Sequence, residues 1–112
     1  MQEIPKRIKR MVREWAGVAH ERDLRVALKE LRGQFERWDL GEIDSFELNQ
    51  FVHKYHDGAS REIWKRYATS HLEPAVASAI VAGVLRRGEL PEELVKHLTG
   101  LIDFYQHELS AS

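Results

Sequence analysis

The histidines His53 and His56 have a spacing that suits a transition metal. At positions i and i+3 of a helix, their imidazoles would lie on one face and could share an ion. Zinc sites in proteins usually have a third protein ligand, and none follows nearby in the sequence. Both histidines also project away from the apolar stripe of their helix, so we interpret the segment as a solvated face. We therefore expect no metal and no cofactor.

A second pair, Arg66 and His71, has residue types that suit phosphodiester cleavage. A histidine can act as a general base, and an arginine can stabilise the charge of a phosphorane-like transition state. The segment RYATSH, residues 66–71, resembles the R-x(4–6)-H motif of the HEPN ribonucleases, which are small all-helical domains. The resemblance implies that His71 is the base and Arg66 the stabilising group. A HEPN-like ribonuclease is therefore one alternative function.

Basic side chains gather near the start of the chain, on a predicted amphipathic helix. Up to residue 13, five cations stand against one acidic residue, Glu3; they are Lys6, Arg7, Lys9, Arg10 and Arg13. Cations on one helix can contact the phosphates of a nucleic acid. The whole chain nevertheless has a net charge of -1, which favours a solvated outer face. Nucleic-acid binding through this helix is the second alternative function.

Other catalytic signatures are absent from the sequence. There is no G-x-S-x-G elbow, phosphate-cradling glycine loop, H-E-x-x-H pair or dinucleotide fingerprint. There is no cysteine, which excludes disulfides and cysteine nucleophiles. The sequence therefore favours a protein that is not an enzyme.

Apolar residues in the first forty positions recur every three or four residues, which predicts helix. They form two stripes, Ile4, Ile8, Met11, Val12, Trp15 and Val18, followed by Leu24, Leu28, Leu31, Phe35 and Trp38. On a straight helix the second stripe points about half a turn away from the first. Either the helix breaks between Gly17 and Asp23, or one helix of roughly 50 Å is buried on opposite sides along its length. The continuous helix would favour a dimer.

Helix-end signals follow this first segment. Gly41 is expected to close it in the left-handed conformation. Asp44, with Glu47 three residues later, has the spacing of a capping box and is expected to start the next helix. Asp57-Gly58 is expected to end that helix.

The remaining signals predict three more helices: a short one over residues 63–67, one from about Glu73 to Arg87, and a final one opened by Pro91. No segment alternates with a period of two for long enough to predict a strand. The sequence therefore predicts an all-α fold, a compact bundle of about five helices with a long or kinked first segment. Residues 1–112 are expected to form a single domain.

Length and composition agree with a globular protein. The chain has 112 residues, of which 43% are hydrophobic and 31% charged. It has no apolar run near the ~20 residues that a bilayer requires and no signal peptide, so we expect no membrane span and a cytoplasmic location. In length, helix punctuation and composition it resembles short, uncharacterised all-helical proteins of bacteria. That resemblance implies no site and no activity.

An excess of apolar faces then predicts protein–protein contact. The two apolar stripes on the first segment present a large apolar surface for one small domain to bury. We expect self-association into a homodimer, or binding of another cytoplasmic protein, through the second stripe, namely Leu24, Leu28, Leu31, Phe35 and Trp38. The alternative is that the first segment folds back between residues 17 and 23 and buries both stripes internally.

Overall fold

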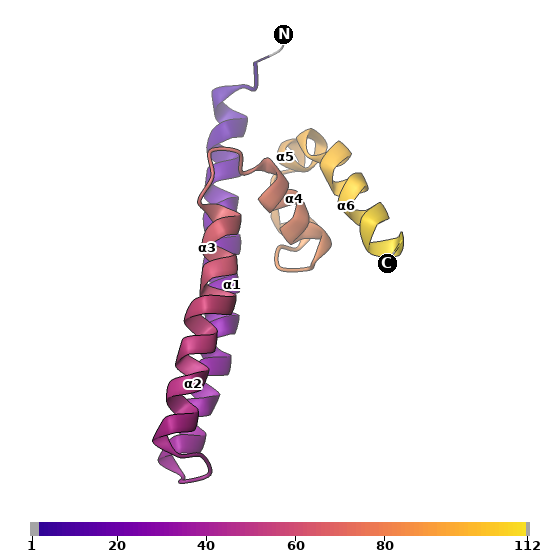
Figure 1. Cartoon of the computed structure of the whole chain (residues 1–112). Helices are drawn as coiled ribbons and strands as arrows, with labels where there is room; N and C mark the ends of the chain where they lie inside the picture. The colour runs from indigo at the N-terminus through magenta and orange to yellow at the C-terminus, as the bar shows by residue number, and fades with distance from the viewer. Residues whose placement is uncertain (1–2, 112) are drawn as a thin grey trace. The chain divides into compact units, whose positions relative to one another are not determined.

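The first helix, α1, is continuous. In the computed structural model, which describes residues 3–111, it runs from Lys6 to Asp39 over 34 residues (Figure 1). Neither Gly17 nor Gly33 has a positive φ, so the backbone stays helical through both glycines. Of the two alternatives for the first segment, the structure has the unbroken helix.

A tight turn closes α1 and starts the second arm. Gly41 has φ 75°, a conformation that costs a residue with a Cβ about 1–2 kcal/mol. The Asp44 Oδ1 atom accepts a hydrogen bond from the Glu47 N–H at 2.8 Å, and the Glu47 carboxylate accepts from the Asp44 N–H at 3.2 Å. The predicted left-handed glycine and capping box are both confirmed. Ile43 is buried in the turn.

The second arm is one helical rod built from three pieces: α2 (Ser45–Tyr55), a π-turn η1 (His56–Ser60) and α3 (Arg61–Tyr67). The residues at both junctions keep helical dihedral angles. The prediction that Asp57-Gly58 ends the helix is therefore wrong. Gly58 lies within the π-turn, and the rod continues through it.

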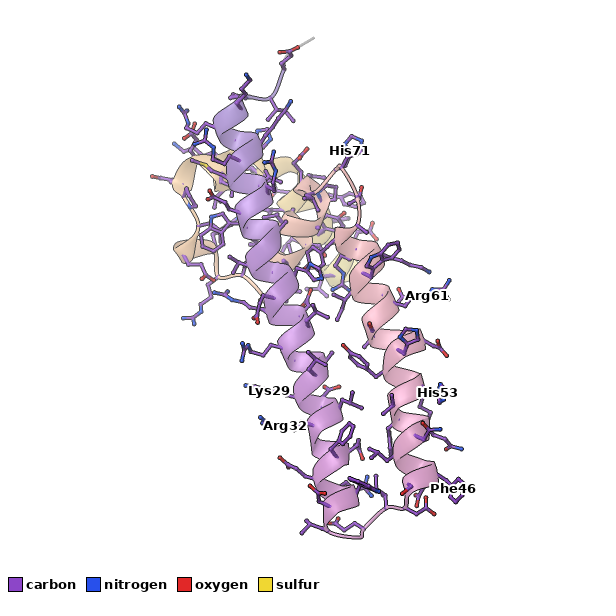
Figure 2. The ribbon with its side chains drawn as sticks, turned by 90° about the vertical axis from the view of Figure 1, so that its left-hand side faces the viewer. Lys29, Arg32, Phe46, His53, Arg61 and His71 are labelled. Carbon is purple, nitrogen blue, oxygen red and sulfur yellow. The ribbon has the colours of Figure 1, made fainter. Side chains whose placement is uncertain are left out.

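Residues 21–68 form a compact unit, which is a helical hairpin. The C-terminal half of α1 lies beside α2 and α3, and the chain reverses direction in the turn between them (Figures 1 and 2). Few of its side chains are buried, namely Ala27, Ile43, Leu48 and Ile63. Two helices alone can cover only the line along which they meet.

Residues 3–20 and 69–111 form a second compact unit, so α1 runs through both. Its other helices are α4 (Glu73–Val81), a 3-10 turn η2 (Arg87–Glu89), α5 (Glu92–His97) and α6 (Thr99–Ala111). Its core is apolar and includes Val76, Leu85, Leu94, Leu98 and Ile102. Arg7 on α1 forms an ion pair with Glu93 at the start of α5.

Two predicted boundaries in this unit are wrong. The helix that starts at Glu73 ends at Val81 and not near Arg87, because Gly83 takes up the left-handed conformation with φ 81°. The final helix is interrupted at Leu98, where α5 ends and α6 begins.

The all-α prediction is confirmed. With α2, η1 and α3 taken as one rod, residues 3–111 form five helical segments besides η2 and contain no strand. None of the helices among these residues has the length and apolar character to cross a membrane.

Candidate functional site

The predicted interaction stripe lies on the hairpin half of α1, and much of it is uncovered. Leu24 and Leu31 are half-buried, whereas Leu28 is 48% exposed, Phe35 42% and Trp38 41%. These three large apolar side chains recur at spacings of seven and three residues, so they lie along one side of the helix. The stripe is therefore only partly used inside the chain.

The stripe ends in an aromatic pair beside the hairpin turn. The rings of Phe35 and Trp38 meet edge to face, with their centroids 6.5 Å apart. The Trp38 Nε1–H donates to the Ser45 Oγ atom at 3.1 Å, which ties the indole to the start of α2. Leu40 and Phe46, on either side of the turn, are 75% and 82% exposed. Figure 2 shows Phe46 projecting outward from the start of α2.

A hollow of about 290 Å³ opens between the two arms of the hairpin. Its walls combine apolar and polar side chains from both arms, namely Ala27, Glu30, Leu31, Gln34, Phe51, Lys54, Tyr55 and Ala59. The two arms therefore do not fill the space between them on this side. Such a hollow can receive a side chain from another helix, as in knobs-into-holes packing.

One polar cluster joins the two arms, and the sequence does not reveal it. Asp23 on α1 is 14% exposed, and its Oδ2 atom accepts hydrogen bonds from the Tyr67 hydroxyl at 2.6 Å and from Arg66 Nη1 at 2.9 Å. Burial, followed by the hydrogen bond and charge of Asp23, raises the pKa of the Tyr67 hydroxyl above its ordinary value. These hydrogen bonds hold the two arms of the hairpin together, so we interpret the cluster of Asp23, Arg66 and Tyr67 as structural and call it the clamp.

The two residues of the ribonuclease motif fall in different units. Arg66 belongs to the hairpin, where its guanidinium forms the ion pair with Asp23. His71 belongs to the other unit and is exposed in the connection that follows α3, as Figure 2 shows. The interpretation as a HEPN-like ribonuclease stays a prediction.

The basic residues near the start of α1 are all exposed, and they differ in their partners. Arg7 forms the ion pair with Glu93. Lys9 and Arg13 instead line a hollow of about 360 Å³ together with Ser70 and His71. Because Lys9 and Arg13 are far from Ser70 and His71 in the sequence, the sequence alone does not reveal that they line one hollow.

The histidine pair of α2 and η1 is exposed. His53 projects from the outer side of the hairpin in Figure 2, and His56 lines a hollow of about 370 Å³ with Asp57 and Trp64 among its neighbours. Among residues 3–111, no three His, Cys, Asp or Glu side chains gather closely enough to hold a metal ion.

Comparison with known protein families, with curated proteins and with solved structures gives no match to this chain. The resemblance to short bacterial helical proteins therefore stays a prediction.

Proposed function

We propose that this protein is a self-associating module, in which the hairpin of one copy packs against the hairpin of a second copy. The proposal is carried by the uncovered stripe of Leu28, Phe35 and Trp38. Full burial of a Leu or Phe side chain contributes about 1.5–3 kcal/mol. Covering three partly exposed side chains of this kind is therefore a substantial driving force for association.

The layer arrangement of the hairpin supports this proposal. Stable domains pack at least two layers of secondary structure, and the hairpin by itself is one layer of two helices. At ~100° per residue, Leu28 and Phe35 lie on one flank of the stripe, while Glu30 and Gln34 of the hollow lie on the other. A second hairpin laid against the flank of Leu28 and Phe35 would complete a four-helix bundle.

The charges beside the stripe favour a second copy as the partner. On α1, Glu21 pairs with Arg25 at 3.1 Å, and Arg32 pairs with Glu36 at 3.7 Å. Because these charges are neutralised within their own helix, two identical faces can meet without net repulsion. A two-fold interface requires this kind of self-complementary surface.

The face of the hairpin is also large enough to form an interface with a second copy. The α1 half of the hairpin is about 28 Å long, and two helices side by side are about 20 Å wide, which gives a flat area of roughly 560 Å². Side-chain relief increases the accessible area beyond this value. The face therefore approaches the ~800 Å² that each partner contributes to a standard specific interface.

The test is sedimentation equilibrium of the chain with Leu28→Glu and Phe35→Glu combined. Leu28 is 48% exposed and Phe35 42%, and neither belongs to the buried core, so the variant is expected to keep its helical circular dichroism and to sediment as a monomer. Charged side chains at the centre of the interface would have no partner after burial, which opposes association.

Val26→Glu is the matched control. Val26 is 61% exposed on the same helix, and at ~100° per residue it points away from the stripe. This variant is expected to remain a dimer. A double variant that is folded and still dimeric would contradict the proposal. The proposal would also be contradicted if the wild-type chain associated only with a different protein and not with a second copy of itself.

A further inference from the structure

A hollow beside the first half of α1 gathers cationic and hydroxyl side chains from two distant parts of the chain. It encloses about 360 Å³ and lies within the unit of residues 3–20 and 69–111. Its walls are formed by Ile4, Lys9, Val12, Arg13, Ser70, His71, Leu72 and Glu73. Apolar side chains thus form part of the wall, and polar groups form the rest.

The cations of this hollow are not neutralised in the way that other cations of the chain are. Arg7 is paired with Glu93, and Arg66 with Asp23. Within the described part of the chain, no ion pair or side-chain hydrogen bond involves Lys9, Arg13 or the imidazole of His71. These groups therefore retain their hydrogen-bond donors for a ligand.

We propose that this hollow binds a phosphate group. A guanidinium presents a planar fork of donors that matches phosphate oxygens, and an ammonium supplies a compact positive charge. The His71 imidazole and the Ser70 hydroxyl add further donors at the same place. The backbone N–H of His71 donates to the Thr69 Oγ1 atom at 3.2 Å, which fixes the turn that carries both residues.

Glu73 is the group in the hollow that opposes an anion. It lies in the first turn of α4, where a carboxylate complements the positive end of the helix dipole. Its negative charge also reduces the attraction of Lys9 and Arg13 for a phosphate. Removal of this charge is therefore expected to strengthen phosphate binding, which gives the proposal a test in the direction of gain.

The charges outside the hollow bear on the source of the phosphate. Lys6, Lys9, Arg10 and Arg13 recur at i, i+3, i+4 and i+7, so they share one face of α1. A ligand with several phosphates in a row, such as a nucleic-acid backbone, would contact this face beyond the hollow. A small phosphate compound would use the hollow alone.

The experiment has two measurements. Fluorescence anisotropy measures the binding of a fluorescein-labelled single-stranded RNA over a series of salt concentrations. The chemical shifts of the His71 side chain measure the binding of inorganic phosphate. Arg13→Ser and His71→Gln are each expected to weaken RNA binding several-fold, and Arg13→Ser to lower the salt slope by about 1. Glu73→Gln is expected to strengthen binding.

Arg61→Ser and His53→Gln are the matched controls, because both side chains project from the outer side of the hairpin (Figure 2). They are expected to leave binding unchanged. Hollow-dependent binding of RNA supports a polymeric source, and hollow-dependent binding of phosphate without RNA supports a small one. Absence of both, or binding that is insensitive to Arg13→Ser and His71→Gln, would overturn the proposal.

Discussion

The Tyr67 hydroxyl donates a hydrogen bond of 2.6 Å to the Asp23 carboxylate and so links the end of α3 to the middle of α1. The two residues are 44 positions apart in the chain. Asp23 is mostly buried, and Arg66 from α3 binds the same carboxylate oxygen. The contact fixes the open end of the hairpin, at the opposite end from the turn at Gly41.

Asp23→Asn is expected to lower the free energy of unfolding by about 1 kcal/mol. The amide removes the negative charge that both donors share, and hydrogen bonds to charged groups are the stronger ones. Chemical denaturation measures the change. Glu21→Gln, at the exposed pair with Arg25, is the control and is expected to have little effect. Equal losses in the two variants would show that the clamp adds nothing specific.

The clamp also predicts a dependence of stability on alkaline pH. Because burial and Asp23 raise the pKa of Tyr67 in the folded chain, the hydroxyl stays protonated after the unfolded chain has begun to lose its proton. Its contribution is therefore complete below pH ~10 and declines as the pH rises above that value.

The measurement is the difference in phenolate absorbance between wild type and Tyr67→Phe during an alkaline titration. We expect a midpoint above the ordinary tyrosine value, and a lower midpoint in the Asp23→Asn background. A difference titration with the same midpoint in both backgrounds would exclude Asp23 as a cause.

Alanine substitutions at two glycines, one in the hairpin turn and one inside α1, are expected to change the stability in opposite directions. Gly41→Ala is expected to destabilise the chain by about 1–2 kcal/mol, because its φ of 75° is left-handed. Gly33→Ala is expected to stabilise it by about 0.5–1 kcal/mol, because Gly33 lies inside α1 and a Cβ there meets no atom within 4 Å. Thermal unfolding of both variants checks the signs. A gain of stability at Gly41 would contradict the turn.

The capping box at the start of α2 predicts a loss of stability when its side-chain acceptor is removed. Asp44→Ala is expected to cost about 1 kcal/mol, because the Glu47 N–H loses its acceptor. Gln50→Ala, on an exposed position inside the same helix, is the control and is expected to be neutral or slightly stabilising. Denaturant unfolding distinguishes the two; a similar result for both would mean that the cap does not hold the start of α2.

Local features of this fold were predictable because their signals lie within a few residues. The three- and four-residue spacing of apolar side chains specifies helix, and the cap of Asp44 and Glu47 is visible as a spacing of three. The left-handed Gly41 was predictable as well, because it follows the last apolar residue of its helix. The other glycines were not: Gly58 continues a helix that it was expected to end, and Gly83 adopts a positive φ inside a segment that was expected to be helical.

The candidate sites depend on contacts between distant residues, which one sequence does not display. Asp23 meets Tyr67 across the hairpin, and Arg7 meets Glu93 across 86 positions. The hollow that joins Arg13 to His71 is of the same kind. The basic helix and His71 were each visible as residue types, but their association requires the folded chain. The apolar stripe was predictable as a stripe, whereas the sequence left open whether it serves as an interaction surface or is buried internally.

The mass of the wild-type chain in solution, measured by light scattering after size-exclusion chromatography, tests the central claim most directly. Self-association of the hairpins predicts a mass of twice the 13.1 kDa of one chain, with a fall towards one chain on dilution. A mass of one chain at every concentration accessible to the instrument would contradict the proposed self-association.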